Sequence, residues 1–416
     1  MRAMKDSGIE WIGEIPKEWK TASFKRINRG LNTGEAIDKA FWSENSQDIP
    51  FYTAGLEPIY TTYQDFPTTK YTRENDILLA RNGTPYVYMP VIHACYTDHI
   101  IKAELIDNVD KRFIQYGLQQ SINSVVGDTV SIPTWSASLW NEQIIPMPNL
   151  EEQTRIADYL DKKCAEIDAL IAAKEKTNAL LKERRQSIIY EAVTKGLDPT
   201  APMKDSGIEW IGEIPEGWDV VALKRLGIPS TGSTPSKDHP EYWDGNIPWL
   251  SSKDLKTDYL TDSEDHITEE AIEKCGLNLL NENTLIFCVR SGILRHTFPV
   301  TIAKMPTTIN QDLRALMLSD NTYPDYVLYY LKGMNDTIVT LYQKIGATVE
   351  SIEMEWFNYL PVVLPSLEEQ KAIAQYLAET CDSIDIVIMA NENIIDELKE
   401  YRQSVIYEAV TGKVEV

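Results

Sequence analysis

The stretch MKDSGIEWIGEIP occurs twice in this chain, at Met4–Pro16 and again at Met203–Pro215. A second pair of matching blocks frames a long helical stretch in each half: LEEQ at 150–153 with RQSIIYEAVT at 185–194, and LEEQ at 367–370 with RQSVIYEAVT at 402–411. Between these blocks the two halves differ in nearly every residue. The repeat predicts one structural frame used twice with two different inserts. Such a frame suits a device that reads two different features at a fixed separation.

The helical stretches carry apolar residues at alternating steps of three and four, which is typical of a coiled-coil seam. The positions run Ile156, Leu160, Cys164, Ile167, Ile171 in the first stretch and Ile373, Leu377, Cys381, Ile384, Ile388 in the second. Asn149 is a plausible N-cap of the first helix, and Ser366 with Glu369 has capping-box spacing at the second. Each helix of about 45 residues would be about 65 Å long. Neither helix can bury its stripe alone, so we expect the two to pack antiparallel.

Polar residues interrupt this seam. Lys174 and Asn178 do so in the first helix, and Asn391, followed by Ile395, stands at the matching place in the second. Polar seam residues can fix the register of paired helices, and they can also simply face solvent. Both interpretations stay open at this point.

The expected fold is α+β: two mixed α/β domains separated by two long antiparallel coiled-coil helices, related by an internal pseudo-two-fold repeat. The Gly/Pro-containing link KGLDPTAP at 195–202 ends the first helix. Short apolar runs at 76–80 and 284–289 read as strands. The predicted boundaries are a variable domain at 1–148, a helix at 149–196, a second variable domain at 197–365 and a second helix at 366–416.

Composition limits the function classes. The chain has 416 residues, a hydrophobic fraction of 43% and a net charge of −23. This length allows two to four domains with their own cores, and no apolar run approaches the roughly 20 residues needed to cross a bilayer. The segment MRAMKDSGIEWIG lacks a signal-peptide core. The five cysteines are scattered without a CxxC pair, so we expect a reducing cytoplasm and neither disulfides nor a zinc site.

The negative net charge argues against a protein that binds nucleic acid on its own, because affinity for phosphates depends on lysine and arginine. One interpretation is a soluble acidic protein with no nucleic-acid role. The other places the acidic faces against basic partner subunits, with small basic clusters facing DNA. On either interpretation, this chain alone should bind DNA weakly.

Catalytic signatures are missing from the sequence. It contains no GxxxxGK[ST] phosphate loop, no Gly-rich dinucleotide fingerprint, no HExxH, no GxSxG and no Asn-Pro-Pro-aromatic tetrapeptide of amino-methyltransferases. The five histidines lack metal-ligand spacing. We therefore expect no catalytic residue, bound metal or cofactor in this chain. A nuclease remains a minor alternative, since no clear PD…(D/E)xK constellation stands out among the 63 acidic residues.

Candidate DNA-binding residues lie in polar loops after the predicted strands. Arginine can contact guanine and asparagine adenine bidentately, and glycine lets the backbone approach closely. The candidates are Arg81, Asn82, Thr84 and Tyr86 in the first half, Arg290, Ser291, Arg295 and His296 in the second, and, more weakly, Ser233, Lys237 and Lys253. Two recurring basic pairs, Lys25-Arg26 and Lys224-Arg225, could hold phosphate. The alternative is that these are ordinary turns and solvated charges.

Over its whole length the chain resembles the specificity subunit of type I restriction-modification systems (HsdS). The resemblance rests on the duplicated SGIEWIGEIP, the LEEQ-x-x-IA-x-YL helix starts, the RQSIIYEAVTKG and RQSVIYEAVTG helix ends, and the two dissimilar domains between them. It implies that each domain is a target recognition domain reading one half of a bipartite, asymmetric site in double-stranded DNA, with the paired helices as a ruler. We expect half-sites about one helical turn, roughly 34 Å, apart.

The resemblance also implies partners. Two modification subunits would carry S-adenosylmethionine and methylate adenine, and two restriction subunits would supply ATP- and magnesium-dependent translocation and cleavage. A related system with a separate or fused nuclease would use the same kind of subunit. The resemblance therefore implies the restriction (motor-nuclease) subunits less directly than the modification subunits. The family has no residue motif for base contacts. The main rival is a regulatory protein that sequesters methyltransferase subunits without reading DNA.

Overall fold

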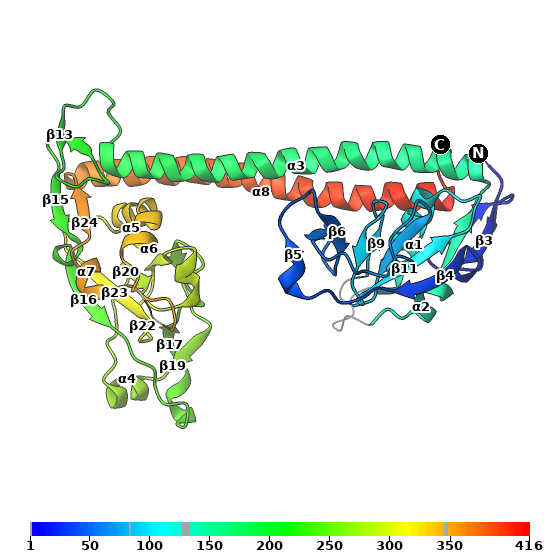
Figure 1. Ribbon diagram of the computed structural model, residues 1–416. Helices are drawn as coiled ribbons and strands as arrows, with labels where there is room; N and C mark the ends of the chain where they lie inside the picture. The colour runs from blue at the N-terminus through cyan, green and yellow to red at the C-terminus, as the bar shows by residue number, and fades with distance from the viewer. Residues whose placement is uncertain (1, 83–84, 127–133, 345, 347) are drawn as a thin grey trace. The chain divides into compact units, whose positions relative to one another are not determined.

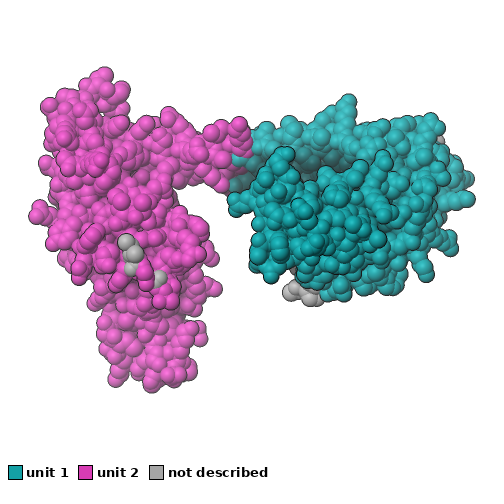
Figure 2. Space-filling model, viewed as in Figure 1, with its two compact units in different colours: residues 1–175, 392–416 teal, residues 176–391 magenta. Residues whose placement is uncertain are grey.

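The computed structural model describes residues 2–82, 85–126, 134–344, 346 and 348–416. They form two compact units, coloured separately in Figure 2: unit 1 contains residues 1–175 and 392–416, and unit 2 contains residues 176–391. The division falls inside both long helices, because each helix segment packs with the mixed domain beside it. The four segments expected from the sequence are bounded by the ends of the long helices, whereas the two units are defined by packing. The four-segment division therefore stays a prediction.

The described part of unit 1 contains two four-stranded sheets (Figure 1). Their strands are β4 (Asn28–Thr33), β5 (Trp42–Ser43), β6 (Ile49–Tyr52), β7 (Ile59–Thr61), β8 (Asp76–Ala80), β9 (Val87–Tyr88), β10 (Cys95–Tyr96) and β11 (Ile100–Leu105). One sheet has the order β4-β11-β8-β9, and the other has the order β10-β6-β7-β5 with β6 and β10 parallel. The further elements are the hairpin β1 (Met4–Asp6) and β2 (Glu14–Pro16), the pair β3 (Lys20–Ser23) and β12 (Ile144–Met147), and the helices α1 (Lys111–Val126) and α2 (Ala137–Glu142).

Unit 2 repeats this plan. Its larger sheet has the order β16-β23-β20-β21-β18 and its smaller sheet the order β19-β17-β22. The strands are β16 (Gly227–Thr231), β17 (Trp243–Leu250), β18 (Tyr259–Leu260), β19 (Asp265–Ile267), β20 (Thr284–Cys288), β21 (Val300–Ala303), β22 (Thr308–Ile309) and β23 (Leu313–Leu318). The further elements are β13 (Met203–Asp205), β14 (Glu213–Pro215), β15 (Asp219–Ala222), β24 (Pro361–Leu364), α4 (Glu269–Cys275), α5 (Pro324–Gly333), α6 (Asn335–Leu341) and α7 (Met354–Phe357).

The central strands lie where the sequence predicts them. β8 (DILLA) and β20 (TLIFC) are buried at every residue. Such continuous burial requires cover on both faces of a strand. In unit 1, Ile77 and Leu79 belong to the core that includes α1, whereas Leu78 and Ala80 belong to the core of the β6 sheet. β8 is therefore the layer that joins the two cores.

The two long helices are α3 (Leu150–Lys195) and α8 (Leu367–Thr411). At α3 the amide of Glu152 donates to Asn149 Oδ1 at 2.9 Å, which confirms the predicted N-cap. At α8 the amide of Glu369 donates to Ser366 Oγ at 3.3 Å while the amide of Ser366 donates to Glu369 Oε2 at 3.2 Å. This reciprocal pair confirms the capping box.

The helices run antiparallel, as expected. In unit 2, Asn178 contacts Asn391, and Arg185, further along α3, forms an ion pair with Asp385, which precedes Asn391 on α8. In unit 1, Cys164 and Ile167 of α3 are buried in the seam. The mixed domains and the long antiparallel helices confirm the predicted fold class. Within the described residues, no helix is both long and apolar enough to cross a bilayer.

The repeated SGIEWIGEIP block joins the start of one long helix to the end of the other. In unit 1, the indole N–H of Trp19 donates to Glu152 Oε2 at 2.9 Å, and the Tyr407 hydroxyl donates to the carbonyl of Ile12 at 3.4 Å. Unit 2 has a similar arrangement: Trp218 donates to Glu369 at 3.2 Å, and the Tyr190 hydroxyl donates at 2.7 Å to the carbonyl of Trp210, one residue before the match of Ile12. The block is repeated because each unit contains one such junction.

Candidate nucleic-acid interface

Three loops meet at one end of the β4-β11-β8-β9 sheet in unit 1. We call them the strand-end loops: residues 34–36 after β4, the described residues 81–82 and 85–86 after β8, and residues 97–99 before β11. The Glu35 amide donates to the carbonyl of Tyr96 at 3.0 Å, and the Arg81 amide donates to the carbonyl of His99 at 2.8 Å. A Cβ added to Gly34 would lie 1.9 Å from the carbonyl oxygen of Tyr96, so only glycine fits this approach. The loops are held together by their backbones.

Unit 2 builds the same three loops at residues 232–236, 289–299 and 310–312. A Cβ on Gly232 would lie 1.8 Å from the carbonyl oxygen of Ile309. The Val289 amide donates to the carbonyl of Asp312 at 2.8 Å, as Arg81 does to that of His99. The backbone frame is therefore shared, although the side chains on it differ.

Strand register fixes which residues of the two units correspond. β8 pairs Ala80 with Ile100, and β20 pairs Cys288 with Leu313. Counting onward, Arg81 corresponds to Val289 and Asn82 corresponds to Arg290. Although Arg81-Asn82-Gly83 resembles Arg290-Ser291-Gly292 in sequence, it is Asn82, and not Arg81, that corresponds to Arg290 in the structure.

In unit 1 the loops bring polar side chains together. Asn82 Nδ2 donates to His99 Nδ1 at 2.6 Å. The Thr97 hydroxyl, which donates to Asp98 at 2.8 Å, is the main cause of a lowered pKa of the Asp98 carboxyl. Burial opposes this effect, and nearby His99 and Arg81 lower the pKa further. Arg81 and His99 are exposed. The cluster offers both donors and acceptors to an external partner.

In unit 2 arginine–carboxylate pairs occupy this position. Arg290 Nε lies 2.7 Å from Asp312 Oδ1. Arg295 binds Glu350 through Nε and Nη2, and this contact lowers the pKa of the Glu350 carboxyl. Both arginines are more than half exposed. Each pair is neutral overall, but its guanidinium group stays exposed at the surface as a hydrogen-bond donor.

The other predicted loop residues lie on or near these loops. Tyr86 is half-buried with its ring centroid 4.8 Å from that of Tyr88. The Ser291 amide donates to the carbonyl of Glu350 at 3.0 Å. Ser233, Lys237 and His296 are exposed, and the carbonyl of Ser233 accepts from the indole of Trp249 at 3.0 Å. Thr84 lies outside the described residues.

Lys253 stands apart from the strand-end loops. Its ammonium lies 3.0 Å from Glu264 Oε2 and 2.9 Å from Asp265 Oδ2. Hydrogen bonds to Asp265 and Glu264 raise the pKa of Lys253. Two carboxylates therefore compensate its charge, which weakens the case for a phosphate contact there.

The recurring basic pairs also lie elsewhere. Lys25-Arg26 and Lys224-Arg225 are exposed on short 3-10 helices that precede β4 and β16. They thus stand at the opposite strand end from Gly34 and Gly232, roughly 15 to 20 Å away along the strand. Lys224 Nζ lies 3.6 Å from the ring centroid of Tyr359. The structure does not bring these pairs together with Arg81 or Arg290.

Sequence reasoning missed His99, Gln311 and Asp312, which lie directly before β11 and β23. His99 contacts Asn82, and Asp312 contacts Arg290. Thr234 Oγ1 donates to Gln311 Oε1 at 2.6 Å, which ties the first loop of unit 2 to the third. A usable signal existed, because Thr-Gly follows the first strand of the large sheet in both halves, at 33–34 and 231–232. The partners across the sheet could not be found without the register of β11 and β23.

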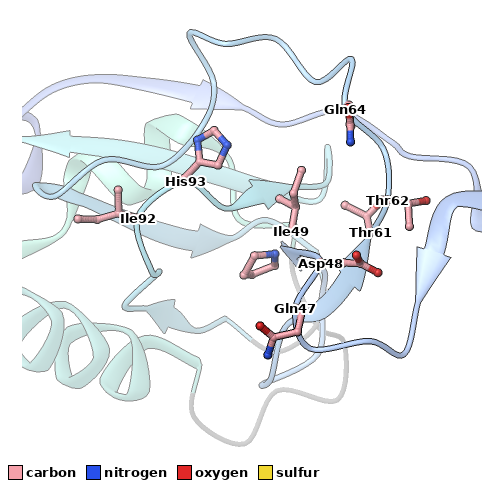
Figure 3. Close-up of a pocket in the computed structure, with 9 residues that line it drawn as sticks. Gln47, Asp48, Ile49, Thr61, Thr62, Gln64, Ile92 and His93 are labelled. Carbon is pink, nitrogen blue, oxygen red and sulfur yellow. The ribbon is translucent and has the colours of Figure 1, made fainter.

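A hollow of about 450 Å³ in unit 1 lies where β6 begins (Figure 3). Gln47, Asp48, Thr62, Gln64 and His93 are among the side chains around it. It offers hydrogen bonds from amides, hydroxyls, a carboxylate and an imidazole. No group of three or more His, Cys, Asp or Glu side chains suited to a metal ion occurs in the described part of the chain. The strand-end loops are the better candidate for a DNA-binding surface, because both units contain them.

Comparison with known proteins gives the family. The model of the type I restriction modification DNA specificity domain matches residues 16–182 and 215–400. The chain is 30% identical over 248 residues to the EcoR124I/EcoR124II specificity subunit of Escherichia coli, covering 58% of this chain and 56% of that protein. It is 28% identical over 435 residues to the putative MjaX specificity subunit of Methanocaldococcus jannaschii, covering 97% and 96%. The matches to the E. coli protein and to the MjaIX subunit of M. jannaschii span only 56% and 42% of those relatives.

Solved structures share the fold. A chain from a structure describing complex assembly and conformational transition of the type I R-M system superposes with a TM-score of 0.72 at 17% identity, covering 96% of this chain and 99% of that one. The HsdS subunit of Thermoanaerobacter tengcongensis superposes with a TM-score of 0.50 at 15% identity, covering 96% and 98%. Because the family model matches both halves of the chain, around the repeated frame and the two dissimilar sets of loops, this protein belongs to the specificity-subunit (HsdS) family of type I restriction-modification systems.

Proposed function

We propose that this chain is the non-catalytic DNA-specificity subunit of a type I restriction-modification complex, in which each unit reads one half of a bipartite, asymmetric site in double-stranded DNA. One observation carries the proposal. The two units hold equivalent strand-end loops on the same backbone frame, with Asn82 and His99 in one and Arg290 and Asp312 in the other. Equal frames with unequal side chains suit two readers of unequal half-sites.

Base reading follows from the chemistry of the loops. In the major groove every base pair presents its own pattern of donors and acceptors. Arginine, asparagine, histidine and glutamine side chains at the loop ends supply matching donors and acceptors. The basic pairs Lys25-Arg26 and Lys224-Arg225 would contact phosphates, which position a protein but carry no sequence information.

The paired helices would set the distance between the half-sites. α3 has 46 residues, and its length is about 69 Å at 1.5 Å per residue. A continuous helix is stiff along its axis, so the spacing of the two half-sites would be fixed by helix length. We propose a spacing of about one turn of DNA, which places both half-sites on one face of the duplex.

Exposed apolar side chains on the helices support docking of partner subunits. Leu170 of α3 and Val387 of α8 stand at equivalent places, six residues after Cys164 and Cys381, and both are about half exposed. Ile386 and Met389 are also exposed, at 66% and 62%. A coiled coil in water normally keeps its outer face polar. Exposed apolar side chains at the equivalent positions Leu170 and Val387 suit two copies of one partner, the modification subunit.

The division of labour would leave chemistry to the partners. The modification subunits would bind S-adenosylmethionine and methylate adenine, and two restriction subunits would bind ATP and magnesium. The net charge of −23 also favours action within a complex, because an isolated acidic chain is repelled by DNA phosphates.

The first test is modified-base sequencing of the source genome with this gene intact and deleted. Loss of one bipartite methyl-adenine motif on deletion supports the proposal and gives the target and spacer together. If complexes with the methyltransferase form and yet no motif depends on this gene, the chain is a sequestering partner instead. A pull-down of the methyltransferase with this chain separates the two.

A further inference from the structure

We propose that Asn82 and Arg290 are the base-reading side chains at one equivalent position of the two units. Asn82 selects adenine, Arg290 selects guanine, and His99 and Asp312 hold them in place. This assignment deepens the proposed function and rests on it.

The equivalence comes from the backbone. The residue two places beyond the end of β8 is Asn82, and the residue two places beyond the end of β20 is Arg290. Each contacts the residue that immediately precedes the neighbouring strand, His99 before β11 and Asp312 before β23. One frame thus carries two different side-chain pairs at the same place.

Within the described part of the chain, the Arg290 pair leaves the two terminal amino groups of the guanidinium unengaged. Nε of Arg290 lies against Asp312 Oδ1 at 2.7 Å, and the side chain is 57% exposed while that of Asp312 is 22% exposed. The ion pair uses Nε, so the two terminal amino groups remain for O6 and N7 of guanine. The carboxylate limits the orientations of the guanidinium, which reduces the entropy lost on binding.

Arg295 is a poorer candidate in the same unit. Both Nε and Nη2 of Arg295 donate to Glu350 Oε1. One half of its fork is therefore already occupied, and reading a guanine would require breaking that contact.

The Asn82 pair presents the complementary pattern for adenine. Nδ2 of Asn82 gives one hydrogen to His99 Nδ1 at 2.6 Å. Among the described residues no other contact of this amide occurs, so the second Nδ2 hydrogen and Oδ1 can match N7 and the N6 amino group of adenine. The imidazole thus plays the part for Asn82 that the carboxylate plays for Arg290.

The test exchanges one pair for the other in the complex reconstituted with its modification subunits. The double variant Asn82→Arg/His99→Asp is expected to change one adenine of the first half-site to guanine, with a preference of about 10- to 100-fold, the range of one good bidentate contact. The second half-site should be unchanged. The readout is the methylated motif from sequencing of a randomised DNA library.

Single variants separate reading from positioning. Arg290→Lys keeps the charge but loses the fork, so guanine discrimination at one position should fall by about 10-fold or more while the other positions keep theirs. Asp312→Ala should weaken discrimination at that same position, and Asp312→Glu should restore part of it. A purely structural residue would lower methylation of all sites alike.

A matched control is Arg29→Ala. Arg29 is an exposed arginine held by Glu104 at 3.1 Å and Asp107 at 2.5 Å, at the opposite end of β4 from the strand-end loops. Its removal should leave the motif unchanged. If the double variant does not assemble, Asn82→Asp replaces it, because this change removes the amide donors and should abolish the adenine preference.

The assignment is overturned if the double variant, or Asn82→Asp, keeps the original first half-site, or if Arg290→Lys keeps full guanine discrimination. Failure of the proposed function looks different. In that case the wild-type complex itself would methylate no bipartite motif.

Discussion

At the scale of single residues, Gly34 and Gly232 show how the strand-end loops are built. Gly34, directly after β4, passes the carbonyl of Tyr96 at the end of β10, and Gly232, directly after β16, passes the carbonyl of Ile309 at the end of β22. Neither has a positive φ, so the need for glycine comes from the close approach and not from the backbone conformation. The Thr-Gly pairs of the sequence are therefore packing constraints that place the loops.

Replacing Gly34 by alanine tests this constraint. The new Cβ would lie 1.9 Å from a backbone oxygen, so the turn must shift, and we expect a loss of about 1–3 kcal/mol in the free energy of unfolding. The control is Gly30→Ala on the same strand, where nothing lies within 4 Å of the added Cβ. Thermal unfolding of both variants checks the difference. Equal stabilities would mean that the approach is not tight.

Asp76 and Lys102 form a buried ion pair in unit 1 that unit 2 lacks. Lys102 Nζ lies 3.3 Å from Asp76 Oδ2, and the two side chains are 5% and 0% exposed. Burial raises the pKa of the Asp76 carboxyl, and the amide of Arg73 and the Lys102 ammonium offset part of that rise. By strand register the equivalent residues of unit 2 are Thr284 and Ala315.

This difference gives a second prediction. Lys102→Ala leaves a buried carboxylate without its cation, so we expect a loss of about 3–5 kcal/mol. The double variant Asp76→Thr/Lys102→Ala copies unit 2 and should recover most of that loss. A raised folded-state pKa favours folding at acid pH, so the defect of Lys102→Ala should be smallest there and grow as the pH rises through that pKa. Denaturant unfolding at several pH values measures both effects.

At the scale of elements, the long helices carry one buried polar contact in the seam of unit 2. Asn391 Nδ2 donates to Asn178 Oδ1 at 2.8 Å, and both side chains are about 5% exposed. By the repeat, Asn178 matches Ile395 and Asn391 matches Lys174. The asparagine pair therefore has no copy on the other side of the repeat. The structure decides the question left open by the sequence, because these two seam residues face each other and not solvent.

Substitution of the asparagines tests the energetics of this contact. Asn178→Leu removes the hydrogen bond between these two buried side chains, and we expect a loss of about 1–3 kcal/mol in the free energy of unfolding. In Asn178→Leu/Asn391→Leu two apolar side chains meet, so stability should return to or exceed the wild-type value, since a polar seam pair lowers stability. Equilibrium unfolding of the single and double variants forms the measurement. Additive losses would argue against direct coupling.

At the scale of the whole molecule, the chain uses one frame twice with independent surfaces. Each unit has its own core, its own junction of hairpin and long helices, and its own strand-end loops. Independent cores allow one mixed domain to change while the other keeps its packing. Under the proposed function, this modularity would allow the two half-sites to be combined freely.

An exchange of residues 21–145 with the corresponding segment of another specificity subunit tests modularity. We expect the methylated motif to change in one half-site only, while the other half-site and the spacer stay as they are. Sequencing of modified bases in cells that carry the chimera is the measurement. A change in both half-sites would show that the two units do not read independently.

The sequence alone determined the repeat, the two long helices with their caps, the central strands and the family. These features are written in local patterns, because helix periodicity, capping residues and apolar runs act over a few neighbouring residues. Arg290 and Asn82 could be chosen as candidates because they follow recognisable strands. The sequence also contained the asparagines of the helix seam, although it could not pair them.

Only the tertiary structure decided which residues meet across a sheet. His99 and Asp312 come from strands distant in sequence from Asn82 and Arg290, and strand register is set by core packing and not by local pattern. For the same reason only the structure shows that Lys25 and Lys224, which the sequence offers as phosphate contacts, lie at the strand ends opposite the strand-end loops. Pairing between strands distant in sequence determines where the loops lie, and the local sequence determines which side chains they carry.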